Sequence, residues 1–320
     1  MKPITIKISI IIPVFNSENT IFNLVSNLVQ VLKNHHIEII LVNDGSKDNS
    51  DRECRKAYEK FSSKVAYYKL GKNFGEHNAV LAGLNQCTGD YAVIIDDDFQ
   101  NPPEEIPYIV NEIITQDYDV LYTYYDKKKH HFFRNLGSKF NDRVATFLIG
   151  KPEDLYLSSF KCLNRFLIDE IIKYRGPYPY IDGLILRSTM NIGKVKVQHN
   201  PRLDGTSNYT IRRLIRLWLN VVVNFSIMPL RLSFLAGTLL TVFGLLLIIF
   251  FFLQKYFLMP EDIWPAGWAS LLVSVIVFSG TQLISLGLIG EYIGKSYLTE
   301  NGTPQYVIRH SLVKQRTGKK

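Results

Sequence analysis

The sequence is poor in cysteine and lacks the two most familiar phosphate-binding loops. Its 320 residues include only Cys54, Cys87 and Cys162, and no CxxC pair occurs. This usage argues against a disulfide scaffold or a zinc ribbon and fits a reducing cytoplasm. No GxGxxG follows the first apolar run, and no GxxxxGK[ST] occurs anywhere. The sequence therefore argues against a dinucleotide-dependent dehydrogenase and against a P-loop NTPase.

Acidic residues are scarce in the last third of the chain. Residues 1–200 hold 25 Lys+Arg and 24 Asp+Glu, whereas residues 201–320 hold 12 and 5, within a net charge of +8. The basic excess thus lies in the most apolar part of the sequence. This combination indicates a membrane surface and no nucleic-acid partner.

Two long runs lack charged residues altogether. Residues 232–254 and 263–290 contain no Asp, Glu, Lys, Arg or His, and about 20 apolar residues are enough to span a bilayer. We predict transmembrane helices at 232–258 and 264–290. Their length and lack of charge disfavour the alternative, a pair of buried helices in a soluble core. The basic flanks predict a multi-pass membrane protein with both flanks in the cytoplasm.

The segments around these runs have their own character. Residues 209–231 begin basic and turn apolar, which is typical of an interfacial amphipathic helix, with a soluble amphipathic helix as the alternative. Residues 291–320 form a basic cytoplasmic tail, and residues 1–208 form a cytoplasmic domain. The N-terminal apolar stretch is too short to span a bilayer and lacks a small-residue cleavage site, so we expect no signal peptide.

The first 200 residues alternate between apolar strand-like runs and segments with helical spacing. We expect strands at five places, each separated from the next by a helix: Ile8–Val14, Glu38–Val42, Val65–Leu70, Tyr91–Ile95 and Asp119–Tyr124. This order predicts an α/β fold with a doubly wound, mostly parallel sheet. Ligands bind such sheets at the carboxyl ends of the strands.

Acidic residues follow two of these strands. Asp96, Asp97 and Asp98 come directly after the fourth strand, and Mg²⁺ or Mn²⁺ with a substrate phosphate would offset the cost of their charge. Alternation along an extended chain lets Asp96 and Asp98 share a side while Asp97 points elsewhere. A solvated acidic turn is the alternative. Asp44, after the second strand, is either a nucleoside-binding residue or an ordinary turn residue.

Four segments together carry a family resemblance: IIPVFNSENTI, VNDGSKDNS, KNFGEHNAVLAGLNQCTGDYAVIIDDDFQNPPE and PRLDGTSNY. The chain resembles the family-2 glycosyltransferases of A-type fold, and within them the polyprenyl-phosphate sugar transferases. The resemblance covers most of residues 7–210, and the C-terminal runs are similar to the two-span bacterial branch. It implies an inverting transfer of one sugar from a nucleotide-sugar, with a uracil-like base, to undecaprenyl phosphate during cell-envelope glycan modification.

The resemblance also implies roles for individual residues. Those implied to bind the nucleotide are Pro13, Phe15, Glu18, Asp44, Lys72, Asn73, Asp96 and Asp97. Those implied to hold Mg²⁺ or Mn²⁺ are Asp96, Asp98 and Gln100. Those implied to hold the lipid phosphate are Arg134, Ser138, Lys161, Arg202 and Ser207. Those implied to be catalytic are Asp98, Arg202 and Asp182.

The chain departs from the family pattern at one segment. Relatives often carry G-D-F-R where this chain carries Ser158-Ser159-Phe160-Lys161. Ser159 therefore lacks the carboxylate, and Lys161 keeps a positive charge without the planar fork of arginine. Asp182 lies near the place where many relatives have a catalytic base. A lipid phosphate is already anionic at pH 7, so the reaction does not require a strong base.

Two other functions stay open. A processive polysaccharide synthase would carry Q-x-x-R-W and usually more spans, and this motif is absent. A non-catalytic membrane scaffold would not need an intact Asp96–Asp98 element. Small residues in the second apolar run would permit helix packing and a homo-oligomer, namely Gly280, Gly287, Gly290 and Gly294.

Overall fold

The computed structural model describes residues 6–125, 152, 155–198, 200, 228–253 and 268–314. It divides into two compact units, one formed by residues 1–210 with 303–320 and the other by residues 211–302. Four predicted site residues lie outside the described residues: Arg134, Ser138, Arg202 and Ser207. Most of the predicted juxtamembrane helix at 209–231 lies outside them as well.

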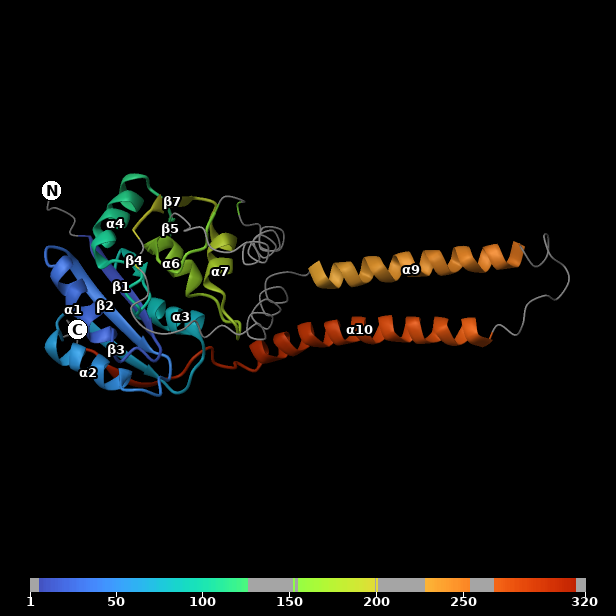
Figure 1. The fold of residues 1–320 in the computed structure, drawn as a ribbon, viewed down its shortest axis with the longest axis horizontal. Helices are drawn as coiled ribbons and strands as arrows, with labels where there is room; N and C mark the ends of the chain where they lie inside the picture. The colour runs from blue at the N-terminus through green and yellow to red at the C-terminus, as the bar shows by residue number, and fades with distance from the viewer. Residues whose placement is uncertain are drawn as a thin grey trace. The chain divides into compact units, whose positions relative to one another are not determined.

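An eight-stranded sheet forms the centre of the first unit, in the order β7-β5-β6-β4-β1-β2-β3-β8 (Figure 1). Its strands are β1 Lys7–Val14, β2 His36–Asn43, β3 Val65–Leu70, β4 Tyr91–Ile94, β5 Val120–Tyr124, β6 Lys161–Asn164, β7 Ile192–Lys196 and β8 Ile308–Leu312. The central strands β4, β1, β2 and β3 run parallel. Only β6 and β8 pair antiparallel with their neighbours. The predicted mostly parallel α/β sheet is confirmed.

Helices alternate with the strands as predicted. They are α1 Ile21–Val31, α2 Ser50–Lys60, α3 Glu76–Gln86, α4 Ile106–Thr115, α6 Arg165–Ile171 and α7 Ile181–Ser188, with a short 3₁₀ turn, η1, at Pro103–Glu105. The five expected strands match β1 to β5 within two residues at each end. Each of those strands is a run of apolar residues bounded by polar turn residues, which is why its place is readable from the sequence.

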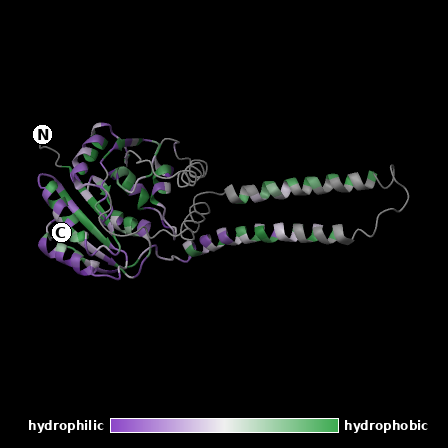
Figure 2. Ribbon diagram, viewed as in Figure 1, coloured by the Kyte–Doolittle hydropathy of each residue, from purple (hydrophilic) through white to green (hydrophobic). Residues whose placement is uncertain are grey.

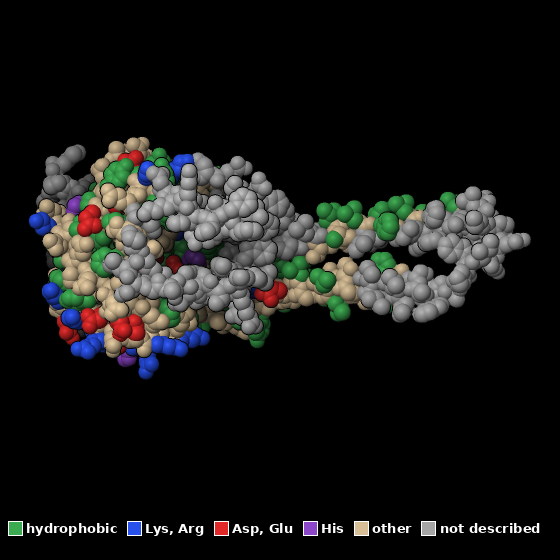
Figure 3. Space-filling model, in the orientation of Figure 1, with side chains coloured by type: hydrophobic (Ala, Val, Ile, Leu, Met, Phe, Trp, Pro, Cys, Tyr) green, Lys and Arg blue, Asp and Glu red, His purple; other side chains and the backbone are tan. Residues whose placement is uncertain are grey.

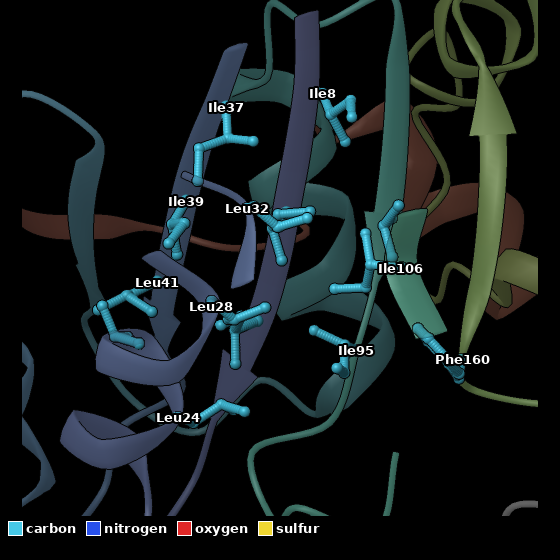
Figure 4. Close-up of a cluster of buried hydrophobic side chains, with 14 of the residues drawn as sticks. Ile8, Leu24, Leu28, Leu32, Ile37, Ile39, Leu41, Ile95, Ile106 and Phe160 are labelled. Atoms are coloured by element: carbon cyan, nitrogen blue, oxygen red, sulfur yellow. The ribbon is translucent and has the colours of Figure 1, made fainter. Parts of the chain in front are cut away.

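The core covers both faces of the central strands. Ile8, Ile10, Ile12 and Val14 of β1 share one hydrophobic cluster with Leu24, Leu28 and Leu32 of α1 and with Ile39 and Leu41 of β2 (Figure 4). On the other face, a Cβ at Gly83 of α3 would lie 2.5 Å from Ile11 Cγ2, so glycine permits the close approach of α3. Burial on both faces explains why β1 lacks the polar alternation of a half-exposed strand.

Part of the predicted basic tail at residues 291–320 has regular structure. Ile308–Leu312 forms β8, which pairs with β3 at the sheet edge. Gln305 Nε2 also donates to the carbonyl oxygens of Tyr174 and Gly176, at 2.9 and 2.8 Å. The sequence gives little sign of this strand because IRHSL is short and largely polar. This segment therefore forms part of the first unit.

The second unit contains two helices, α9 Met228–Leu253 and α10 Trp268–Glu300. Figure 2 shows that apolar residues dominate α9, while the C-terminal end of α10 is more hydrophilic. Within the described residues, no helix meets the combined length and hydropathy criteria of a membrane span.

Candidate active site

The loops after β1 and β2 are fastened to each other by side chains. Asn16, at a positive φ of 56°, accepts the Lys47 N–H at 3.0 Å and donates its own N–H to Ser46 Oγ at 3.1 Å. Glu18 accepts the N–H of Asn49, immediately before α2, at 2.8 Å. An acceptor beside the first turn of a helix satisfies donors that lack intrahelical partners. Glu18 thus has a defined structural contact in addition to its predicted place near the nucleotide.

Asp44 shapes the neighbouring loop. Its two carboxylate oxygens accept the backbone N–H groups of Phe74 and Gly75 at 2.7 and 2.8 Å, and the residue is 3% exposed. Burial raises the pKa of Asp44, and these two hydrogen bonds partly offset that rise. Lys72 and Asn73 on the same loop are exposed. The structure therefore places Asp44 beneath the loop that presents these two side chains.

The three carboxylates after β4 have different surroundings. Asp97 turns toward β1, where it accepts the Phe15 N–H at 3.1 Å and the Ser17 hydroxyl. Asp96 instead accepts the Ser159 hydroxyl at 2.5 Å, and Asp98 accepts the Gln100 N–H at 3.1 Å. Burial, followed by the negative charges of Asp96 and Asp98, raises the pKa of Asp97 to about 6. Asp97 is thus an anchor of the β1 loop.

A polar cavity of about 240 Å³ opens beside Asp96. The residues lining the cavity are Asp96, Gln100, Asn101, Tyr125, Tyr156, Leu157, Ser158 and Ser159. The structure therefore brings together Asp96 and Gln100, two of the three predicted metal ligands, at the carboxyl end of the sheet.

The side chains that follow β4 suit a hard divalent cation. Asp96, Asp98 and Gln100 offer oxygen ligands, which Mg²⁺ and Mn²⁺ prefer. In the described part of the chain, no group of three or more His, Cys, Asp or Glu side chains is placed to hold a metal. Mg²⁺ is commonly bound by one or two carboxylates together with substrate phosphates. The donors present fit a metal site that is completed by the substrate.

Lys161 and Asp182 form a buried ion pair. Lys161 Nζ contacts Asp182 Oδ1, and the same oxygen accepts the Tyr122 hydroxyl at 2.7 Å. The two charged residues are 4% and 7% exposed. The family resemblance implies that Lys161 holds a lipid phosphate, but in the structure its ammonium group contacts Asp182. Tyr122 carries no sequence signal of this role.

The N-terminal ends of α3 and α7 meet beside the ion pair of Lys161 and Asp182. His77, in the first turn of α3, packs edge-on against Tyr180, which precedes α7, with ring centroids 5.1 Å apart. Desolvation lowers the pKa of His77 to about 4, so the imidazole is neutral at pH 7. Glu76 is exposed at its surface, but neighbouring protein atoms exclude part of the water around its carboxyl group. This partial desolvation, followed by the negative charge of Asp96, raises the pKa of Glu76 to about 7.

The remaining predicted nucleotide residues lie at the same end of the sheet. Phe15 is 39% exposed directly after β1, and Pro13 is half-buried opposite Val42 in the ladder between β1 and β2. Together with the exposed Lys72 and Asn73, Phe15 offers an aromatic face, a cation and an amide at one edge. Sequence reasoning missed Ser17, Tyr122 and Tyr180, whose contacts depend on distant parts of the chain.

A mostly parallel sheet with a carboxylate cluster after its fourth strand, beside a polar cavity, is the arrangement of an A-type glycosyltransferase. The chain belongs to glycosyl transferase family 2, whose family description matches residues 9–172. It is a glycosyltransferase.

Curated relatives are similar over nearly the whole chain. The undecaprenyl-phosphate 4-deoxy-4-formamido-L-arabinose transferase of Serratia proteamaculans is 31% identical over 306 residues, covering 95% of this chain and 93% of the relative. The protein of the same name from Klebsiella pneumoniae (strain 342) is 32% identical over 321 residues, covering 98% and 96%.

Solved structures share the fold. The crystal structure of Mycobacterium tuberculosis glucosyl-3-phosphoglycerate synthase aligns with a TM-score of 0.51 at 18% identity, covering 68% of this chain and 78% of that one. The same enzyme in complex with Mn²⁺, uridine diphosphate and glucosyl-3-phosphoglycerate also aligns with a TM-score of 0.51. At this identity the likeness supports the fold alone.

Proposed function

We propose that this protein transfers one sugar from a nucleotide-sugar, most simply a UDP-sugar, to undecaprenyl phosphate. The observation that carries the proposal is the pair Asp96 and Asp98 at the end of β4, beside a polar cavity, in a chain that covers its curated relatives almost end to end. Those relatives are named for transfer to undecaprenyl phosphate. The product would serve cell-envelope glycan modification.

Asp96 and Asp98, with Gln100, would hold Mg²⁺ or Mn²⁺ against the diphosphate of the donor. The ion would supply positive charge that stabilises the leaving nucleoside diphosphate. The oxygen donors of Asp96, Asp98 and Gln100 support this assignment. The ordered contacts of Asp96 and Asp98 preorganise the two carboxylates for it.

The nucleoside would lie across the edge formed by the loops after β1, β2 and β3. Phe15 offers a face for stacking, while Lys72 and Asn73 are exposed for phosphate and base contacts. Asp44 would act by fixing this loop through Phe74 and Gly75. Pro13, Glu18 and Asp97 would hold the β1 side of the same pocket.

The acceptor phosphate would attack sugar C1 directly. Its oxygen forms the new bond to C1 as the bond from C1 to the diphosphate oxygen breaks, so the anomeric configuration inverts. The acceptor is already an anion and loses no proton in this step, which removes the need for a general base. Arg202 would offset charge on the diphosphate or the lipid phosphate, and Arg134, Ser138 and Ser207 would bind the lipid phosphate; sequence resemblance alone supports these four assignments.

We also propose that α9 and α10 cross the bacterial inner membrane, with the first unit in the cytoplasm. The argument rests on their composition: residues 232–253 of α9 and 268–290 of α10 contain no charged residue. Figure 3 shows hydrophobic side chains gathered along both helices, and Phe234 and Ile284 are 77% and 72% exposed. Contiguous exposed apolar surface of this kind marks a membrane or partner contact. A bilayer would also bring the enzyme to its lipid acceptor.

Incubation with undecaprenyl phosphate, Mn²⁺ and a panel of UDP-sugars tests the proposal. The protein is purified in detergent, and the lipid is followed by mass spectrometry. A mass gain of one sugar that chelation abolishes is the expected result. A gain of many sugars would identify a processive synthase. A folded protein that forms no product with any donor would support a scaffold.

A further inference from the structure

A buried ion pair lies close to Asp96 and the polar cavity. The side chains of Lys161, Asp182 and Tyr122 are in contact in the interior of the first unit. Burying an ion pair costs desolvation that its mutual attraction rarely exceeds, and apolar residues of similar size are often at least as stabilising. Such a pair next to a reaction site is therefore a candidate for function.

The register of the sheet fixes where this pair lies. Lys161 is the partner of Ile94 in β4 and of Tyr122 in β5. Ser159, two residues before Lys161, donates to Asp96. The short segment from Ser159 to Lys161 thus links Asp96 to Asp182, where the end of β4 meets the beginning of β6.

Within the described residues, Asp182 accepts hydrogen bonds at only one of its two oxygens. Tyr122 and Lys161 both donate to Oδ1, and no described residue donates a hydrogen bond to Oδ2. The Asp182 side chain retains 10% exposure, so the carboxylate is not fully sealed. A carboxylate held at one oxygen and open at the other is a preorganised acceptor for a ligand hydrogen bond.

The surroundings of Asp182 suit a sugar. α3 packs against α7, which places His77 and Tyr180 together beside the ion pair. The neutral imidazole of His77 can donate one hydrogen bond and accept another. Aromatic and imidazole rings with a fixed carboxylate offer an apolar face and a directional acceptor, the combination that binds a ring bearing hydroxyl or amide groups.

We propose that Asp182 determines donor-sugar specificity, with its Oδ2 accepting a hydrogen bond from one hydroxyl or amide N–H group of the sugar. Lys161 and Tyr122 are positioning residues that hold Oδ1. Asp182 therefore reads the sugar and takes no proton in the transfer. This inference rests on the proposed nucleotide-sugar chemistry and specifies which residue selects the donor.

Binding measurements on Asp182→Asn test the inference. The affinities of UDP, UDP-glucose, UDP-galactose, UDP-N-acetylglucosamine and UDP-xylose are measured by calorimetry with Mn²⁺. The variant should bind UDP within about twofold of wild type but lose about tenfold or more in affinity for the preferred UDP-sugar, the usual value of a hydrogen bond to a charged group. Asp169→Asn, a carboxylate in an exposed ion pair with Arg165, is the matched control and should change neither affinity.

A second series identifies the sugar group that is read. Deoxy analogues of the preferred donor, each lacking one hydroxyl or amide, are bound to wild type and to Asp182→Asn. One analogue should bind wild type about tenfold more weakly but lose nothing further in the variant, because the two changes remove the same hydrogen bond. Equal losses for UDP and every UDP-sugar, or no such coupling for any analogue, would overturn the inference.

The experiment also covers a variant that does not fold and a failure of the proposed function. If Asp182→Asn does not fold, Asp182→Glu replaces it, and an order of donor preference identical to wild type overturns the inference. These experiments use donor binding without the lipid. Failure of the proposed function, seen as the absence of a lipid product, is therefore distinguishable from failure of the sugar assignment.

Discussion

Ser159 Oγ donates to Asp96 Oδ2 across 2.5 Å, which joins the segment before β6 to the carboxylate cluster after β4. The two residues are 63 positions apart in the sequence. This hydrogen bond fixes the orientation of Asp96, which lines the polar cavity. A hydroxyl at position 159 therefore orients a predicted metal ligand without adding another negative charge beside it.

Ser159→Ala should weaken metal binding. Loss of one hydrogen bond to a carboxylate costs about 1 kcal/mol, so the Mn²⁺ concentration at half-saturation should rise about fivefold. Electron paramagnetic resonance in the presence of UDP measures this directly. Ser159→Thr keeps the hydroxyl and should stay close to wild type. An unchanged Mn²⁺ titration in Ser159→Ala would show that the contact does not orient the ligand.

Asp44→Asn should destabilise the loop that presents Lys72 and Asn73. An amide has one acceptor oxygen, so either the Phe74 or the Gly75 N–H loses its partner. A buried donor without an acceptor costs about 1–3 kcal/mol, which should lower the thermal midpoint and weaken UDP binding. Calorimetry on the purified protein gives both values. Asp90→Asn, at an exposed bend where the amide oxygen can still accept the Lys7 N–H, is a suitable control. Wild-type UDP affinity in Asp44→Asn would argue that this loop does not touch the nucleotide.

Asp97→Asn should stabilise the fold above pH 6 while sparing the predicted metal ligands Asp96 and Asp98. The carboxylate accepts two donors from the β1 loop at Oδ2, Phe15 N–H and the Ser17 hydroxyl, and an amide oxygen can accept both. The neutral side chain avoids the burial cost and the repulsion from Asp96 and Asp98 that raise the pKa of Asp97 to about 6, so the thermal midpoint at pH 8 should rise. Mn²⁺ binding should persist. A complete loss of Mn²⁺ binding would instead identify Asp97 as a ligand.

Glu76 should make stability depend on pH. Its pKa in the folded protein, about 7, lies above the ordinary value of 4.5. The folded state therefore binds this proton more tightly than the unfolded state, so stability falls as pH rises between these values and the loss is complete above about pH 7. Thermal midpoints of wild type and Glu76→Gln should diverge over that window, with the variant favoured at high pH. Parallel curves for the two proteins would contradict the assignment.

Local patterns were enough to predict the first five strands and their helices. β1 to β5 are apolar runs with polar ends, and burial on both faces leaves that mark in the sequence. β6, β7 and β8 went unpredicted because polar residues interrupt their apolar runs, and each pairs with a strand distant in the sequence. Long-range pairing decides these strands, and no local window contains it.

The site shows the same division. The position of Asp96 and Asp98 at the end of β4 follows from where that strand stops. The partners of Lys161 and Asp182 do not follow from any spacing, because the path of α6 and α7 brings them together. Asp44 stands at its predicted strand end, yet its contacts are with the loop before α3. Sequence locates the chemistry on the sheet, and the packed structure determines which groups touch.

The lipid product of wild type and Asp98→Ala is the most direct test of the central claim, that carboxylates after β4 drive transfer of one sugar to a lipid phosphate. Both proteins are incubated with undecaprenyl phosphate, Mn²⁺ and the accepted nucleotide-sugar, and the lipid is weighed by mass spectrometry. Wild type should add one sugar, and Asp98→Ala should be slower by about 100-fold or more, the usual effect of removing a group that stabilises transition-state charge. Product formation by Asp98→Ala at the wild-type rate would contradict the account.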